Sequence, residues 1–358
     1  HLILPDGEGK EKYENARKAY QRYKDENIIH QIDQPSIFVY RQESANFNQQ
    51  GLILGISLQD YEDGNIVKHE HTREKPLEDR MNHINATRVA AGSVWSVYRN
   101  DGKINRIQER IKEAEPIFDF ELYGYRHILW QETDPKTIQV LTELLKNRKV
   151  YIADGHHRAA SAAEYRKQRI SNPNIDTEKY HAWNYLLSYL ASDEQVRILA
   201  YNRIIRQLNE QPKKFLKKLE NTYQIERVDR ACNPECKHEI ASCIKGIWYR
   251  LKVKSSSFNS RVEGLDVSIL QDKVIGPILN IKDIRASDNI FFVGGIQDPK
   301  KLEEYVKKDG NAILFNLFPV DIKDLEYIAE SGGVMPPKST WFDPKVLSGL
   351  VLHDLNEN

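Results

Sequence analysis

The sequence predicts an α/β fold with mixed sheets, and three observations support this prediction. Short apolar segments with the composition of strands alternate with helical segments along most of the 358 residues. Several early strand candidates follow one another directly, which indicates antiparallel pairs within the sheets. The chain is 40% hydrophobic and 29% charged, and no apolar run approaches the ~20 residues of a membrane span. We therefore expect a globular chain of two or three domains.

The first part of the chain holds most of the strand candidates. We expect strands at 36–42, 51–58, 93–98, 117–122, 124–132, 150–153 and 182–191, where β-branched and apolar residues gather. We expect helices at 11–24, 76–91, 104–114, 134–147 and from the turn after 153 to 168. The fourth of these helices has the clearest start, because Asp134 can cap its first turn and Pro135 suits its first position.

The alternation renews at Pro212 and sets the expected domain organisation. We expect helices at 212–220, 234–244, 267–279, 299–308 and 322–331, and strands at 223–228, 247–253, 290–294 and 312–317. The sequence thus predicts a core at 1–202, a second α/β domain at 203–331, and a C-terminal loop and strand, 332–358, that returns to the core. Because the chain starts at His1 without a preceding Met, we expect the encoded protein to begin earlier.

The strongest chemical signal is the segment Asp154-Gly155-His156-His157-Arg158, which joins a buried strand to a helix. The first turn of a helix offers unpaired backbone N–H groups and a partial positive charge. Gly155 allows close approach of a ligand to the backbone, and the next three side chains add donors. A plain N-cap with satisfied polar neighbours would explain any one residue, but five together favour a phosphate site.

A second signal is His69-Glu70-His71-Thr72-Arg73, which Arg80 follows closely. On an extended segment His69 and His71 would share one face and Glu70 would take the other. The pattern fits a metal ligand pair or a carboxylate that acts as general base or holds Mg²⁺. A solvated, charge-rich strand end explains it equally well, and the spacing of a zinc protease is absent.

The segment Lys338-Ser339-Thr340 follows Pro336-Pro337 and could present one cation and two hydroxyls to an anion. Its glycine spacing does not match a P-loop, and the two prolines disfavour a helical cradle. Taken alone, the segment favours a stiff structural loop. We nevertheless predict that it reaches the cleft of Gly155, because several segments hold a multiply charged anion better than one.

Charge and cysteine content exclude or disfavour several classes. Lys plus Arg and Asp plus Glu both number 52, and this balance disfavours a nucleic-acid partner. The three cysteines, Cys232, Cys236 and Cys243, are too few for a disulfide scaffold, so we expect a reducing cytoplasm. Their uneven spacing favours free thiols over a zinc site.

Read in order, these motifs resemble a widespread bacterial and archaeal family catalogued as a domain of unknown function. That family has been linked to free serine kinases of the ParB/sulfiredoxin-like superfamily. The matching segments are 39–42, 51–64, 69–73 with Asp79-Arg80, Arg126-His127 with Leu129-Trp130, 152–158 and 334–349. Full-length members carry further sequence before the segment that matches residues 1–5. The chain departs from the family at Tyr201-Asn202-Arg203, where a His is expected before the Arg.

The resemblance implies a ParB/sulfiredoxin-like nucleotide-binding core and a set of site residues. Nucleotide contacts would come from Gly155, His156, His157 and Arg158, with Lys338, Ser339 and Thr340 in addition. Glu70 would act as the base on the acceptor hydroxyl, with Asp154, His156 and His157 as further catalytic candidates and Asp154 as a Mg²⁺ ligand. Substrate contacts would come from His69, His71, Thr72, Arg73 and Arg80.

Two kinds of function remain open at this stage. The first is a phosphotransferase that uses ATP or ADP with Mg²⁺ on a small hydroxyl substrate, as a free serine kinase does. The alternative is a non-catalytic or NTP-hydrolysing regulatory protein that binds nucleotide. We expect a nucleotide and a small molecule as partners, no membrane partner, and leave a homodimer open.

Overall fold

The computed structural model describes residues 1–255 and 257–356, which form two compact units. Unit 1 comprises His1–Val196 and the C-terminal segment from Pro344, and unit 2 comprises Arg197–Asp343. The sequence placed these boundaries after residues 202 and 331. The observed boundaries differ because β10 (Arg197–Ile205) pairs with β16 (Thr340–Asp343), which keeps both strands in unit 2.

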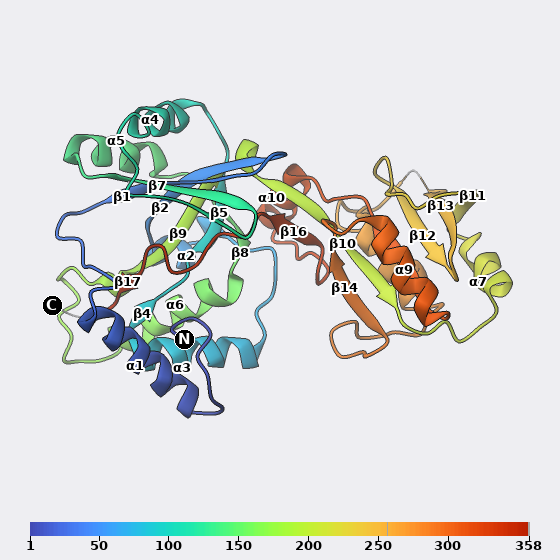
Figure 1. The fold of residues 1–358 in the computed structure, drawn as a ribbon, viewed down its shortest axis with the longest axis horizontal. Coiled ribbons are helices and arrows are strands. Elements are labelled where there is room, and N and C mark those ends of the chain that lie inside the picture. The colour runs from blue at the N-terminus through green and yellow to red at the C-terminus, as the bar shows by residue number, and fades with distance from the viewer. Residues whose placement is uncertain (256, 357–358) are drawn as a thin grey trace. The chain divides into compact units, whose positions relative to one another are not determined.

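The mixed α/β fold expected from the sequence is confirmed, and unit 1 contains its larger sheet (Figure 1). Within the described residues this sheet has eight strands in the order β3-β8-β5-β9-β2-β1-β7-β6. Their bounds are β1 (Ile37–Glu43), β2 (Asn48–Ser57), β3 (Ile66–Val67), β5 (Val94–Tyr98), β6 (Phe118–Leu122), β7 (Tyr125–Glu132), β8 (Val150–Asp154) and β9 (Tyr185–Ser192). Most neighbours are antiparallel, but β3 runs parallel to β8 and β5 runs parallel to β9.

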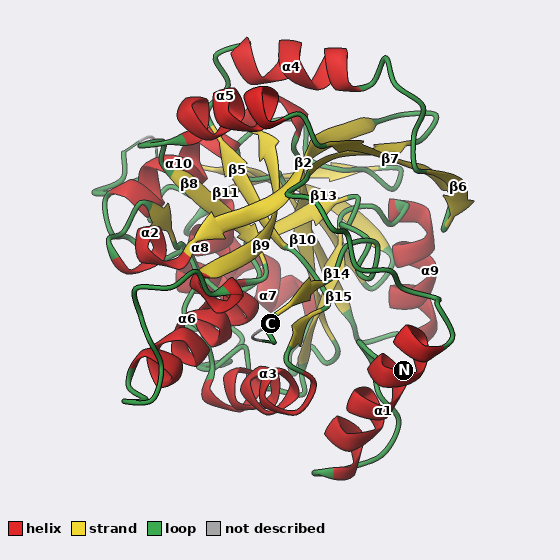
Figure 2. Ribbon diagram, turned by 90° about the vertical axis from the view of Figure 1, so that its left-hand side faces the viewer, coloured by secondary structure: helices red, strands yellow, loops and turns green. Residues whose placement is uncertain are grey.

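Helices of unit 1 pack in two groups that both views separate. Helices α4 and α5 lie side by side, and α1, α3 and α6 follow one another in a second group (Figures 1 and 2). Their bounds are α1 (Glu11–Asp25), α2 (Leu58–Glu62), α3 (Glu74–Thr87), α4 (Lys103–Ile111), α5 (Pro135–Leu145) and α6 (His156–Ile170). A two-stranded pair of β4 (Val89–Ala90) and β17 (His353–Asp354) ties the C-terminal segment to the end of α3.

The core of unit 1 explains why its central strands form. The first four residues of β8 are buried, and Val39, Leu52, Val94 and Ile152 belong to one apolar cluster with 0% exposure each. Burial of such side chains contributes about 1.5–3 kcal/mol each. The cluster therefore fixes the central strands, and with them the point at which β8 leaves the sheet.

Helix α3 is shorter than the sequence predicted. It ends at Thr87, because Arg88 adopts a left-handed conformation with φ 51° that stops the helix. Residues 89 and 90 then form β4 instead of the last helical turn. The start of the predicted strand at 182–191 likewise forms a 3₁₀ turn, η1 (Ala182–Asn184), before β9, and a second turn, η2 (Asp193–Gln195), follows it.

Unit 2 contains a second sheet, in which the neighbouring strands are antiparallel, with the order β11-β13-β12-β15-β10-β14, and β16 pairs with the first half of β10. Its further strands are β11 (Tyr223–Val228), β12 (Glu239–Ile244), β13 (Ile247–Val253), β14 (Ile290–Gly294) and β15 (Ile313–Leu317). Its helices are α7 (Pro212–Leu219), α8 (Asp266–Leu270), the π-helical turn η3 (Gln271–Ile275), α9 (Pro299–Asp309) and α10 (Ile322–Glu330).

One prediction for unit 2 is wrong, and one strand of this unit was not predicted. The helix predicted at 234–244 is instead a loop followed by β12, which forms a tight hairpin with β13. Lys245 and Gly246 both have positive φ, as a two-residue hairpin turn requires, and all six residues of β12 are buried. Strand β10, which the sequence analysis did not identify, crosses the expected boundary between domains.

Candidate functional site

The candidate site lies in unit 1 at the edge of the sheet where β8 ends. Because β3 and β8 are parallel neighbours, the segments that follow them, 68–73 and 155–158, emerge at the same edge. Strand β5 runs antiparallel to β8, so its first residues lie at that edge as well. The Arg158 guanidinium accordingly donates from Nη1 to the carbonyl oxygen of Ser93 at 3.1 Å. Three segments far apart in the sequence therefore meet at the start of α6.

Gly155 gives the start of α6 its shape. It is the N-cap residue with φ 100°, a conformation that other residues rarely adopt, and a Cβ there would lie 3.4 Å from the Cα of Val94. Glycine has no side chain to accept hydrogen bonds from the first turn, so no side-chain cap covers the helix start. The Arg158 backbone N–H donates to the Gly155 carbonyl at 2.9 Å, so the N–H of His156 is the group of this turn that is available to an anion.

Asp154, which precedes this glycine, is held by two donors. Its Oδ1 accepts from the Gly155 backbone N–H at 3.1 Å, and its Oδ2 accepts from Lys345 Nζ at 2.9 Å. Burial would raise the pKa of the Asp154 carboxyl, but the nearby Lys345 ammonium, together with Arg158 and His156, outweighs this effect and holds the pKa below its ordinary value. Asp154 is therefore a carboxylate at neutral pH.

Lys345 is a site residue that the sequence analysis missed. It lies 191 residues after Asp154 and reaches the site because the C-terminal segment returns to unit 1. Backbone oxygens of this segment, at Pro344 and Lys345, accept hydrogen bonds from Gln49 and Gln42. The only signal in the sequence was its place in the segment 334–349 that matches the family.

His69 and His156 form a buried pair beside the turn. Their rings meet edge to face with centroids 4.5 Å apart, and each residue is only 4% exposed. Burial lowers the pKa of His156 to about 4, although the Asp154 carboxylate opposes this, and burial together with His156 holds the pKa of His69 well below its ordinary value. Both imidazoles are neutral at pH 7.

Each imidazole of the pair leaves one nitrogen unused. His69 Nδ1 and His156 Nε2 are buried and have no hydrogen-bond partner within the described structure. A neutral imidazole carries one donor and one acceptor nitrogen, and an unmade hydrogen bond at a buried nitrogen costs about 1–3 kcal/mol. A ligand that bonds to His156 Nε2 would recover this energy.

The Glu70 side chain lies next to the pair of His69 and His156 and forms no hydrogen bond with His156. Its Oε2 is 3.8 Å from His156 Nδ1, which is too long for a hydrogen bond, and its side chain is 40% exposed. The structure places the rest of the segment differently from the prediction. Residues 68–73 form a loop rather than a strand, so His69 is buried while His71 is exposed, and the two do not share a face.

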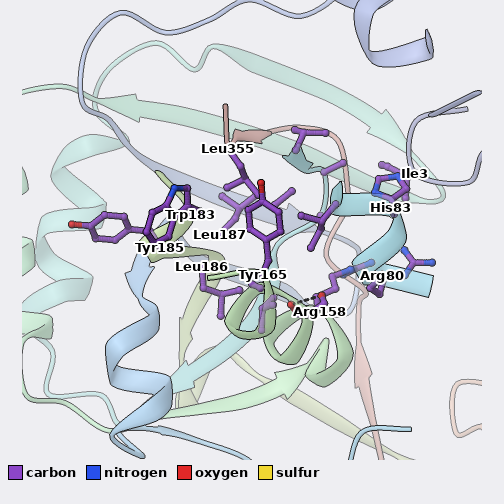
Figure 3. Close-up of a pocket in the computed structure, with 18 residues that line it drawn as sticks. Ile3, Arg80, His83, Arg158, Tyr165, Trp183, Tyr185, Leu186, Leu187 and Leu355 are labelled. Carbon is purple, nitrogen blue, oxygen red and sulfur yellow. Dashed lines mark hydrogen bonds between the residues drawn. The ribbon is translucent and has the colours of Figure 1, made fainter. Parts of the chain in front are cut away.

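The remaining predicted substrate residues fall into two places. Thr72 and Arg73 are exposed, and the backbone N–H of Arg73 donates to His157 Nε2 at 3.0 Å, which joins the loop to α6. Arg80 of α3 is half-buried and forms an ion pair with Asp79 at 2.8 Å. It lines a pocket together with Arg158, so the structure brings these two cations to one cavity (Figure 3).

Lys338, Ser339 and Thr340 belong to unit 2, where a buried arginine organises their loop. Arg203 is 1% exposed and donates to the carbonyl oxygens of Lys338 and Pro337 at 2.9 and 3.4 Å, and Ser339 Oγ donates to Pro336 at 2.6 Å. Lys338 has φ 59°, and its Nζ lies 5.2 Å from the centre of the Tyr201 ring. A shared cleft with Gly155 stays a prediction.

The described residues contain neither a metal-binding cluster nor a membrane-spanning helix. Among residues 1–255 and 257–356, no group of three or more His, Cys, Asp or Glu side chains is arranged to hold a metal ion, and the three cysteines are free. In the same residues no helix has the length and apolar character needed to cross a bilayer.

Several solved structures are similar to this chain at low identity. A free serine kinase variant in complex with ADP is 13% identical, with a TM-score of 0.41 over 87% of this chain and 91% of that chain. The free serine kinase in complex with AMP is 11% identical, with a TM-score of 0.41 and the same coverage. A conserved hypothetical protein from Pyrococcus furiosus is 12% identical, with a TM-score of 0.40 over 83% of this chain and 94% of that chain.

A match to a protein-family model identifies the family of the chain. The comparison with curated proteins found no match to the chain. The family model described as "Protein of unknown function (DUF1015)" matches residues 1–268, which include the turn 154–158 and the loop 68–73. This match spans well over half of the chain, and the family resemblance noted from the motifs is thereby confirmed: the chain belongs to the DUF1015 family.

Proposed function

We propose that the protein is a nucleotide-dependent phosphotransferase that acts on a small hydroxyl substrate. The observation that carries the proposal is the turn between β8 and α6. There an uncapped helix start, the Arg158 guanidinium and the unpartnered Nε2 of buried His156 come together. Each of these groups suits a phosphate oxygen, and together they suit a di- or triphosphate.

The charges around the turn support binding of an anion rather than a neutral ligand. Arg158 stays charged even though burial lowers its pKa. The charge of Arg80 lies close enough to lower the pKa of Arg158 further. Lys345, which pairs with Asp154, adds a third cation to the site. Bringing positive groups together costs free energy, which a bound polyphosphate would offset.

In the proposed reaction Glu70 is the general base that acts on the hydroxyl group of the acceptor substrate. Its carboxylate is half-exposed and is not fixed by a hydrogen bond to His156, so it can turn toward a substrate hydroxyl. As the terminal phosphoryl group passes from the nucleotide to the hydroxyl oxygen, Glu70 accepts the hydroxyl proton. The His156 N–H at the start of α6 and Arg158 stabilise the negative charge on the transferred group.

Asp154 is proposed as the protein ligand of a Mg²⁺ ion that arrives with ATP or ADP. Such an ion would neutralise charge on the phosphates. The pairing of Asp154 with Lys345 keeps the carboxylate ionised, which a cation ligand requires. On binding of the nucleotide, the Lys345 ammonium would contact a phosphate oxygen.

A transfer assay tests the proposal. The protein is incubated with Mg²⁺, ATP or ADP, and serine or other small alcohols, and the phosphorylated product is measured by mass spectrometry. We expect Glu70→Gln to reduce turnover by about 10²–10⁴-fold, the usual contribution of a general base, and to keep nucleotide affinity. Glu78→Gln, at an exposed glutamate of α3, is the matched control and should retain turnover.

The outcomes separate this function from its alternative. Saturable nucleotide binding without product in any acceptor mixture would favour a regulatory nucleotide-binding protein over an enzyme. Absence of nucleotide binding would contradict both.

A further inference from the structure

The pocket beyond Arg158 extends from the phosphate site into the apolar interior of unit 1. Val94 and Arg158 belong to both places, since Val94 lies against Gly155 and Arg158 belongs to the turn itself. Side chains from α3, α6, β9 and the C-terminal segment complete the walls (Figure 3). A ligand held by its phosphates at the turn would therefore have this pocket beside it.

The walls of the pocket differ from one side to the other. The aromatic side chains of Trp183 and Tyr165 lie toward one side, whereas Arg80, His83 and Arg158 lie toward the other (Figure 3). Aliphatic residues such as Leu186 and Leu355 lie with the aromatic side chains. A ligand that is flat and apolar at one end and anionic at the other matches this distribution.

One polar group on the apolar side is unsatisfied. Trp183 is 2% exposed, and its Nε1–H is buried without a hydrogen-bond partner within the described structure. The other polar side chains of the pocket are partly engaged, because His83 Nε2 bonds with the Leu2 carbonyl at 2.7 Å and Ser161 donates to the Arg158 carbonyl at 2.9 Å. The pocket thus offers a buried donor that calls for an acceptor from a ligand.

We infer that this pocket binds the base of the nucleotide and that it favours adenine over guanine. The inference rests on the proposed function, because the phosphates at Arg158 position the base. The described lining residues include no Asp, Glu, Asn or Gln side chain. Guanine would bury two donor groups, N1–H and the 2-amino group, without a side-chain carboxylate or amide to accept from them. Both purines bring ring nitrogens that can accept from Trp183, but adenine buries only one donor group, its 6-amino group.

The same helix offers a variant that fills the pocket and a matched control. Ala162 of α6 lines the pocket, so Ala162→Leu adds three carbons to its wall. Gln168 lies on the exposed side of the helix, and Gln168→Leu makes a similar change away from the pocket. Trp183→Phe removes the N–H and keeps most of the ring, which provides a second probe if Ala162→Leu does not fold.

The experiment measures the binding of ADP, GDP and inorganic pyrophosphate to the full chain by isothermal titration calorimetry. In the wild type we expect ADP to bind at least about tenfold more tightly than GDP and than pyrophosphate. Ala162→Leu should reduce ADP affinity to that of pyrophosphate and leave pyrophosphate binding unchanged, while Gln168→Leu changes neither. Trp183→Phe should weaken ADP about fivefold, the equivalent of one hydrogen bond between neutral groups.

Different failures point to different parts of the account. Equal affinities for ADP and pyrophosphate in the wild type would overturn the base pocket and leave the phosphate site standing. Equal affinities for ADP and GDP, both tighter than pyrophosphate, would overturn the preference for adenine. Failure of all three ligands to bind would contradict the proposed function itself.

Discussion

Helices α5 and α6 both begin after a strand and an aspartate, yet they use that aspartate in opposite ways. Asp134 is the N-cap of α5, and its carboxylate accepts from the Thr137 backbone N–H at 2.9 Å. Asp154 lies one position earlier relative to its helix, because Gly155 takes the N-cap place of α6. Its carboxylate turns to Lys345 instead, and the first turn of α6 keeps no side-chain cap.

The difference between the two helix starts results from Gly155, which takes the N-cap position of α6. At α5 the protein satisfies its own helix start, which stabilises the fold and leaves little for a ligand. At α6 no side chain caps the first turn. The neutral imidazole of His156 is buried beside this turn, and the Arg158 guanidinium belongs to it. Such an arrangement gives up stability at one point, as functional sites commonly do. Four predictions test the comparison.

The first prediction concerns pH. The pKa of His156 is about 4 in the folded state and ~6.5 when unfolded, so the unfolded state binds the proton more readily. Stability is therefore full above about pH 6.5 and falls as the pH drops toward 4, by roughly 3 kcal/mol in total. His156→Gln should flatten urea-unfolding free energies measured between pH 7 and 4.5, apart from a remaining contribution of His69.

At the start of α5 we expect stability to depend on pH in a different range. The hydrogen bond from Thr137 lowers the pKa of Asp134, so its contribution is lost only as the pH falls below the ordinary range of a carboxyl. An unchanged slope between pH 7 and 4.5 in His156→Gln would show that the buried imidazole is not the source.

The second prediction concerns affinity. Arg158→Ala should weaken nucleotide binding by about 1.5–3 kcal/mol, the scale of a hydrogen bond to a charged group. Arg166→Ala is the control on the same helix, since Arg166 pairs with Glu62 at 2.7 Å outside the turn. Equal losses in both variants would mean that net charge, rather than the turn, decides binding.

The third prediction concerns the capped helix. Asp134→Ala should lower the free energy of unfolding by about 1 kcal/mol, because α5 loses its cap. Nucleotide affinity should not change. Chemical denaturation and calorimetry on the same sample check both halves, and a change in affinity would argue that α5 takes part in the site.

The fourth and smallest effect concerns Lys345. Lys345→Gln should raise the pKa of Asp154 toward its ordinary value, because the ammonium that lowers it is gone. The pair is half-exposed, so the free energy of unfolding should change by less than about 1 kcal/mol. An NMR titration of the Asp154 carboxyl measures the shift, and an unmoved pKa would assign the effect to Arg158 or His156 instead.

The sequence predicted the local structure around residues 154–158 well and the long-range neighbours of this turn poorly. The turn 154–158 could be recognised because strand end, glycine and helix start follow one another directly. Lys345 could not, because it reaches Asp154 only through the return of a distant segment. The pocket proposed to bind the base was equally hidden, since Trp183 and Leu355 meet α6 only in the folded unit.

In the fold, too, local features could be predicted from the sequence and long-range ones could not. Most strands and helices of unit 1 followed from composition and caps. Strand β12 was taken for a helix because Pro234 suggests a helix start and no period of two is visible in a strand that is buried on both faces. Strand β10 escaped notice because its polar residues, Asn202 and Arg203, are buried by partners that the sequence does not reveal.

The central claim is that the uncapped start of α6 holds the phosphates of a nucleotide. Calorimetric titration of ADP with Mg²⁺ into the wild-type chain and into Gly155→Val tests it most directly, because a branched side chain at φ 100° distorts this turn. We expect one ADP per chain in the wild type and no measurable binding in a folded Gly155→Val protein. Unaltered ADP affinity in that variant, or no binding to the wild type at millimolar ADP, would contradict the claim.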